Sequence, residues 1–234
     1  MVISDNPILN IKDIHYEWPG RIPFTLNVPD FSVHPAESVL LLGESGSGKS
    51  TLLSLICGTI MPSKGVVQVA GNDLSKLSAS LLDQFRVEKI GIIFQQFNLL
   101  PFGSVLDNIL LPLSFAPERR ARVVQPKETA RKLCTDLGLP DNLLNMRAST
   151  LSVGQQQRVA VARAMIGEPA LLVADEPTSA LDESTQIAFL DLLFTQSQNN
   201  NTSLLMVSHD ERLSKYFDRV VRMTEIASFG KTTL

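Results

Sequence analysis

The pattern of hydrophobic and polar positions predicts short buried strands that alternate with helices. Continuous apolar runs of strand length occur at residues 38–42, 90–94, 170–174 and 204–207. Segments whose apolar positions recur at helical spacing follow most of these runs. Strands that alternate with helices are typical of α/β proteins, so we expect an α/β core.

The N-terminal part of the chain shows a different pattern. Residues 8–14 and 24–28 alternate between apolar and polar positions, which predicts two strands around a loop that ends in a turn at Pro19-Gly20. We therefore expect an N-terminal antiparallel β subdomain. Further predicted elements are a strand at 66–69, an amphipathic helix at 78–89 and an edge strand at 218–223. The tail at 224–234 is expected to be loosely held.

The pattern changes again from residue 97 to about 150. Apolar and helical residues dominate there, several prolines interrupt the run, and no strand pattern is convincing. The expected organisation is a single domain in which residues 1–95 and 154–234 form the core and 96–153 form an inserted helical subdomain. The apolar stretch 97–113 is either a groove for a partner helix or ordinary core.

Composition changes this picture only slightly. The chain has 234 residues, of which 44% are hydrophobic and 19% charged. Its net charge of −3 lacks the basic excess that is typical of proteins that wrap nucleic acid. No apolar run approaches the length of a bilayer span, so we expect a soluble, cytoplasmic protein. Cys57 and Cys134 lie in apolar helical patterns and are interpreted as buried free thiols. A set of basic residues is expected on a solvated helix face, with a binding patch as the alternative: Arg119, Arg120, Arg122, Lys127, Arg131 and Lys132.

The stretch Gly43–Ser50 fits the pattern G-x-x-x-x-G-K-[ST] and lies between a predicted strand and a predicted helix. Its glycines let backbone N–H groups point inward at phosphate oxygens, and the following helix N-terminus adds partial positive charge. Lys49 supplies a full charge for the β- and γ-phosphates, and the Ser50 hydroxyl can bind Mg²⁺. The predicted nucleotide-binding residues are Gly43, Glu44, Ser45, Gly46, Ser47, Gly48, Lys49, Ser50 and Thr51.

Three other predicted strands end in polar residues, at the edge of the sheet where ligands sit in open α/β folds. Gln95 can reach Mg²⁺ or the attacking water. Asp175 is placed to hold Mg²⁺, and Glu176 to orient and deprotonate a water. His209 is a candidate γ-phosphate contact. The predicted metal site comprises Ser50, Gln95 and Asp175, and the predicted catalytic residues are Glu176, His209 and Gln95.

Two further positions have both a structural and a functional interpretation. Ser152, with Gln155 three residues later, predicts a capping box at the start of a helix through Met165. The exposed N-terminus of that helix is also a possible second anion site. Trp18 either stacks on a base or covers the edge of a small sheet, with Tyr16 as the alternative for stacking.

Taken together, these motifs resemble the ATP-binding cassette (ABC) family over nearly the whole chain. Gly43–Ser50 looks like its Walker A loop, Gln95 like its Q-loop glutamine, and Leu171–Glu176 like its Walker B strand with the catalytic glutamate. Residues 151–155 resemble its signature, with Val153 where the family usually has glycine. Ser179–Asp182 looks like the D-loop, with Asp182 as its acid, and His209 like the switch histidine. The residues implied to touch the opposite subunit's ATP are Ser152, Val153, Gly154 and Gln155.

The resemblance implies a P-loop NTPase (RecA-like) core, ATP hydrolysis with ATP and Mg²⁺, and a head-to-tail homodimer. Within the family, Phe97–Pro101 with Ser104–Ile109 resembles the lipoprotein-releasing, macrolide-exporting and cell-division group (LolD-, MacB- and FtsE-like). That group implies a separate integral membrane permease, a peripheral position on the inner face of the cell membrane, and a periplasmic adaptor as a candidate further partner. The alternatives are a simple solute importer ATPase and a non-transport ABC ATPase that works with DNA or ribosomes.

Overall fold

The structure is a computed structural model that describes residues 6–18, 24–179 and 181–231. The chain forms two compact units, which are described separately. The first comprises residues up to Arg86 together with those from Ser203 onward, and the second comprises Val87–Thr202. The helix α2 (Ala79–Lys89) crosses from the first to the second. The predicted boundaries of the helical insertion, at 96 and 153, stay a prediction.

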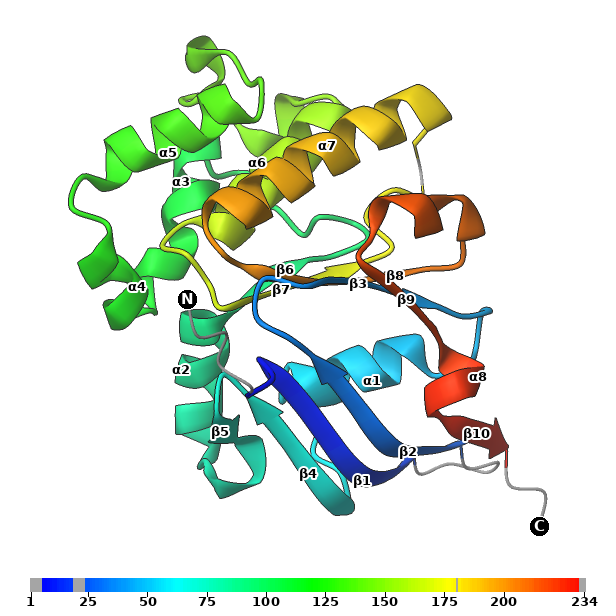
Figure 1. Ribbon diagram of the computed structural model, residues 1–234. Helices are drawn as coiled ribbons and strands as arrows, with labels where there is room; N and C mark the ends of the chain where they lie inside the picture. The colour runs from blue at the N-terminus through cyan, green and yellow to red at the C-terminus, as the bar shows by residue number, and fades with distance from the viewer. Residues whose placement is uncertain (1–5, 19–23, 180, 232–234) are drawn as a thin grey trace. The chain divides into compact units, whose positions relative to one another are not determined.

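The first unit contains an antiparallel sheet in the strand order β10-β2-β1-β4-β5 (Figure 1). The alternation that predicted β1 and β2 places Ile11, Leu26 and Val28 in the core, where each is fully buried. The strands are β1 (Leu9–Trp18), β2 (Phe24–Val33), β4 (Lys64–Val69), β5 (Asn72–Asp73) and β10 (Ser228–Lys231). This sheet confirms the expected N-terminal antiparallel subdomain.

The same unit contains parallel strands. The strand β3 (Ser38–Leu42) pairs with β8 (Ser203–Ser208) on one side and with β9 (Arg219–Arg222) on the other. The helix α1 (Lys49–Ile56) follows β3, and the unit also holds α8 (Met223–Ile226) and the 3₁₀ turns η1 (Leu74–Lys76) and η5 (Glu211–Tyr216). All residues of β3 after Ser38 are buried, which agrees with its continuous apolar run.

The second unit contains a parallel strand pair and most of the helices. The strand β6 (Ile90–Ile93) pairs with β7 (Leu171–Asp175). Helix α6 (Val153–Met165) packs against α3, α5, α7 and β6 (Figure 1). The other helices are α3 (Val105–Leu110), α4 (Pro117–Arg122), α5 (Pro126–Asp136) and α7 (Glu183–Asn199), with the 3₁₀ turns η2 (Leu111–Ser114), η3 (Asp141–Leu143) and η4 (Ala148–Thr150).

The regular elements within residues 97–150 are helices and 3₁₀ turns, as the sequence predicts. All of these residues are described, and their only β contact is an isolated bridge between Ser104 and Arg147. Cys57 and Cys134 are buried free thiols, which confirms that expectation, and burial raises the pKa of the Cys134 thiol to about 11. None of the helices in the described residues combines the length and the apolar character needed to cross a bilayer.

Three expectations are wrong. Trp18 ends β1, paired with Phe24, instead of lying on a loop; the Pro19-Gly20 turn lies outside the described residues. The described part of the tail, residues 224–231, is held in place, because β10 pairs with β2 after the short helix α8. Arg119 is buried, 1% exposed, and does not share the solvated face of its basic neighbours. Its guanidinium donates to the carbonyl oxygens of Val87, Ala164 and Ile166, and its burial lowers its pKa to about 10.

Candidate nucleotide site

The loop that joins β3 to α1 has the backbone geometry of a phosphate cradle. Gly46 and Gly48 have φ values of +81° and +90°, a region that residues with a Cβ rarely adopt. A Cβ on Gly48 would lie 3.2 Å from the Phe24 ring and 3.1 Å from Leu26, so the loop also needs glycine there to pack on β2. Gly48 begins α1 without a side-chain cap, which leaves the helix N–H groups available to an anion.

Lys49 brings a positive charge into this loop. Its side chain is buried, and its Nζ donates to the carbonyl oxygens of Gly43 (2.7 Å) and Glu44 (2.9 Å). The Ser47 hydroxyl is the one buried side-chain polar atom of the described residues that lacks a hydrogen-bond partner. A buried hydroxyl without a partner is destabilising unless a ligand completes it. Both groups fit a phosphate oxygen.

His209 lies directly after β8 and shares a pocket with this loop. The pocket has a volume of about 430 Å³, and five loop residues line it together with His209. They are Gly43, Glu44, Ser45, Gly46 and Ser47. The tertiary structure therefore brings together a loop and a histidine that lie more than 160 residues apart in the sequence.

The pocket is also lined by residues that the sequence analysis missed. Arg222 and Glu211 line it and are joined by an ion pair of 3.0 Å, and Met223, Thr224 and Phe229 complete the lining. The available signal was the edge strand predicted at 218–223, which pairs with β3 and so ends near the loop that follows β3.

Trp18 and Thr51 are in direct contact. The indole Nε1 donates to the Thr51 hydroxyl at 3.1 Å, and the Tyr16 ring meets the Trp18 ring edge-on at 5.3 Å between centroids. Trp18 is 44% exposed, so one face of the indole is accessible beside the first turn of α1. Ser50, in the same turn, is exposed.

The second unit holds the predicted carboxylates and glutamine at one end of its strand pair. Because Ile93 is in register with Ala174, the segments that follow β6 and β7 leave the pair at the same edge. Asp175 ends β7, Glu176 follows with φ +43°, and both are half-buried. The Gln95 amide lies 3.4 Å from the Ser179 hydroxyl, which connects the segment after β6 to the segment after β7.

Asp182 caps helix α7. Its carboxylate accepts hydrogen bonds from the Ser184 hydroxyl, the Thr185 N–H and the Thr185 hydroxyl. These bonds hold the pKa of the Asp182 carboxyl far below its usual range. The rest of the segment that begins at Ser179 includes Ala180, which lies outside the described residues.

The helix α6 begins with the predicted capping box. The Gln155 N–H donates to the Ser152 hydroxyl at 3.3 Å, and the Ser152 N–H donates to the Gln155 side chain at 3.0 Å. Val153 is 53% exposed at the first helical position, and a Cβ on Gly154 would meet open space. Helix α6 therefore presents an open N-terminus at which an anion could approach Gly154 closely.

The chain is similar to known ATP-binding cassettes over most of its length. Residues 26–179 match the family model described as "ABC transporter". The lipoprotein-releasing system ATP-binding protein LolD of Pseudomonas fluorescens is 36% identical over 95% of this chain and 97% of LolD. The macrolide export ATP-binding/permease protein MacB of Rhodopirellula baltica is 41% identical over 83% of this chain, which corresponds to 28% of MacB.

Among solved structures, a dimeric post-hydrolysis state of the ATP-binding cassette MJ0796 bound to ADP and Pi is similar, with a TM-score of 0.78 and 30% identity. The similarity covers 92% of this chain and 93% of the MJ0796 chain. Three observations agree. The family model spans more than half of the chain, relatives above 30% identity match almost all of it, and the loop after β3 has the geometry of a phosphate cradle. The chain belongs to the ABC transporter family, in which it is an ATP-binding ATPase.

Proposed function

We propose that two copies of this chain pair head to tail around two molecules of ATP–Mg²⁺, and that hydrolysis drives a separate membrane permease. The observation that carries the pairing is the similarity to MJ0796, because that cassette is described as a dimer with ADP and Pi. A pocket lined by the phosphate loop and His209 supports the nucleotide's place in this chain.

Within one copy, the loop N–H groups, Lys49 and the Ser47 hydroxyl hold the phosphates, and the accessible face of Trp18 takes the base. Ser50, Gln95 and Asp175 would hold Mg²⁺. The metal supplies neutralisation of charge on the β- and γ-phosphates. Glu176 orients the attacking water and accepts its proton, and His209 donates to the γ-phosphate.

The second copy completes the site. Ser152, Gly154 and Gln155 of one copy would meet the γ-phosphate held by the other, through the open N-terminus of α6. The exposed Val153 side chain would lie in this interface in place of the family's usual glycine. Asp182, at the start of α7, would lie beside the same interface.

The relatives support a permease partner of the lipoprotein-releasing and macrolide-exporting type. LolD matches along nearly its whole length, and MacB, an ATP-binding/permease protein, matches along 28% of its length. Large apolar side chains exposed on the second unit are candidates for contact with such a partner at the inner face of the cell membrane: Phe94, Phe102, Phe115, Val124 and Met146. The cargo would be a lipoprotein, a peptide or a drug, with a periplasmic adaptor as a candidate further partner.

Glu176→Gln tests the pairing. The amide keeps the size of the side chain but cannot accept the proton of the water, so ATP should bind, persist and hold the dimer together. Light scattering should show dimers only when ATP is present, and turnover should fall by at least about 100-fold. Glu183→Gln, an exposed glutamate in the first turn of α7, is the matched control and should behave as wild type.

The partner is tested by purification of the tagged chain from detergent-solubilised membranes. Recovery of a membrane permease in the presence of ATP would support the proposal. Recovery of ribosomes or DNA would support the non-transport alternative instead, and a solute-import permease would support the importer alternative.

A further inference from the structure

The helix that carries the signature also carries two buried polar side chains outside the predicted site. Gln157 is 1% exposed, and its amide Nε2 donates to the carbonyl oxygen of Pro177 at 2.9 Å. Arg163 is 8% exposed, and its guanidinium donates to the carbonyl oxygens of Phe97 at 2.5 Å and Asn98 at 2.7 Å. Both side chains donate hydrogen bonds to backbone carbonyls of loops outside α6, and these loops belong to the second unit.

Each of these loops carries a predicted catalytic residue. Pro177 directly follows Glu176, and Phe97 follows the pair Gln95-Gln96. The backbone is unusual at both places: φ is +43° at Glu176, +58° at Phe97 and +48° at Asn98. Non-glycine residues hold such conformations only where the surrounding structure enforces them. Gln157 and Arg163 donate to backbone carbonyls at or directly beside these positions.

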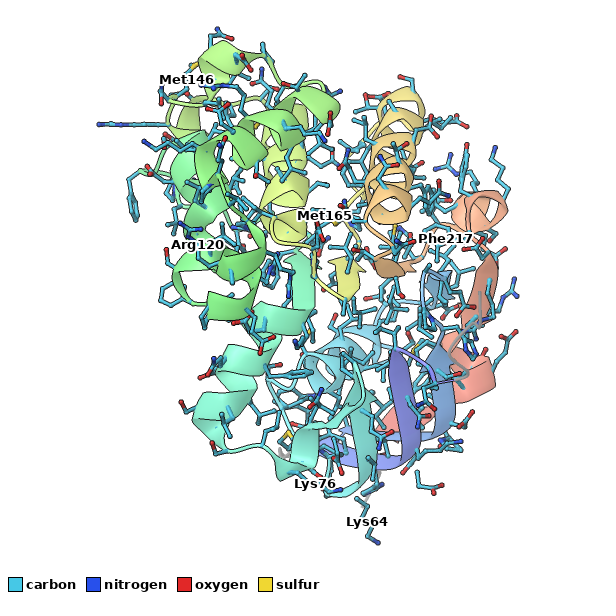
Figure 2. All side chains as sticks on the ribbon, turned by 60° about the vertical axis from the view of Figure 1, so that its left-hand side comes forward. Lys64, Lys76, Arg120, Met146, Met165 and Phe217 are labelled. Atoms are coloured by element: carbon cyan, nitrogen blue, oxygen red, sulfur yellow. The ribbon has the colours of Figure 1, made fainter. Side chains whose placement is uncertain are left out.

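The two donors also lie on one rigid body. Gln157 and Arg163 are six residues apart, which is about 9 Å along a helix. The helix is packed against α3, α5, α7 and β6, and it is drawn in Figure 2 above the labelled Met165, which is its last residue. A shift of α6 therefore moves both loops together.

We infer that Gln157 and Arg163 are positioning residues that hold the Glu176 and Gln95 loops from a single helix. The inference rests on the proposed roles of Glu176 and Gln95. Because the same helix begins at Ser152 and Gly154, contact of its N-terminus with the opposite copy's nucleotide is transmitted to the catalytic loops of its own copy. The helix thereby links the two nucleotide sites of the dimer.

A double-mutant cycle separates positioning from ordinary core packing. Gln157→Met keeps the volume of the side chain but cannot donate to Pro177. If Gln157 acts through Glu176, its loss should lower kcat about 10- to 100-fold in the wild-type background, with KM for ATP changed by less than about threefold. In the Glu176→Gln background the same substitution should change the single-turnover rate by less than about twofold, because the group that it positions is already gone.

Arg163 is tested in the same way through Gln95. Arg163→Lys keeps the charge but can reach only one carbonyl, so kcat should fall while KM stays close to wild type. The fall should disappear in a Gln95→Ala background. Arg163→Met is the more severe variant, and Arg163→Lys keeps the test available if Arg163→Met does not fold.

Arg158→Met is the matched control, because the Arg158 guanidinium also donates to a backbone carbonyl, that of Gly138, in a loop without a predicted site residue. It should leave kcat unchanged.

The outcomes are distinct. Equal losses of rate with and without Glu176, or wild-type rates in both single variants, would overturn the inference while leaving the role of Glu176 intact. Normal turnover of Glu176→Gln by itself would instead remove the proposed role of Glu176, and the Gln157 part of the inference with it. Losses confined to backgrounds that retain Glu176 and Gln95 would confirm the positioning roles.

Discussion

At the scale of single residues, Lys49 shows how the chain prepares for a polyanion. Its side chain is buried, and its ammonium group donates to the carbonyl oxygens of Gly43 and Glu44. A buried cation is strongly favoured by a counter-charge, and the loop N–H groups around it attract the same ligand. The loop therefore combines a positive charge with inward N–H donors, as the proposed phosphate site requires.

Lys49→Ala should weaken ATP binding by roughly 2–5 kcal/mol, because a desolvated charge contact is lost. Isothermal titration calorimetry measures the loss directly. Lys64→Ala removes an exposed lysine of β4 in the same unit and should leave the affinity unchanged. Full ATP affinity in Lys49→Ala would contradict the assignment of the loop.

Trp18 is the only tryptophan, so its fluorescence reports on one site. If the base stacks on the accessible indole face, ATP should shift the emission, and Trp18→Ala should weaken ATP binding by about 1–3 kcal/mol. Trp18→Phe, which keeps an aromatic ring, should retain most of the affinity. An unchanged emission spectrum together with unchanged affinity would favour the alternative that Trp18 covers the sheet edge.

At the scale of elements, the N-terminal caps define where the functional helices begin. Ser152 caps α6 and Asp182 caps α7, each with side-chain acceptors for N–H groups of the first turn. Uncapped ends leave backbone donors unpaired, so α1, whose cap Gly48 has no side chain, has first-turn N–H groups that an anion can reach. The side-chain caps thus distinguish the starts of α6 and α7 from the start of α1.

The Asp182 cap makes a pH-dependent contribution to stability. Its folded pKa is depressed, so the contribution is fully present above the unfolded value of about 4 and is lost as pH falls through the lower folded value. Asp182→Asn should therefore lower the Tm at pH 7, and the difference from wild type should shrink below about pH 4. Asp191→Asn, an exposed change inside the same helix, should show no comparable effect in the same melting series.

At the scale of the whole molecule, catalysis requires two copies in the proposed arrangement. The rate per subunit should then rise with total protein concentration and level off once the dimer is fully formed. A dilution series of the wild-type ATPase, with mass measured by light scattering, checks this. A constant rate per subunit in samples that remain monomeric would contradict the paired site.

The accuracy of the predictions made from the sequence differs between elements. Local patterns predicted β3, α1, α6 and β7 with nearly their observed bounds, because periodicity, caps and the phosphate motif depend only on neighbouring residues. The sequence did not predict the buried state of Arg119, since its position in a basic run looks solvated. Its burial follows from carbonyls at Val87, Ala164 and Ile166 that only folding brings near.

The sequence by itself determined the chemical groups of this protein: a loop with the pattern of a phosphate-binding site, carboxylates at the end of a buried strand, and a capped helix with a small residue at its start. These depend on local backbone geometry and side-chain type. Only the tertiary structure decided that His209, Arg222 and the phosphate loop share one pocket, and that Gln157 and Arg163 hold the loops of Glu176 and Gln95. Those contacts join residues that lie far apart in the chain, so the spacing of these residues in the sequence does not predict the contacts.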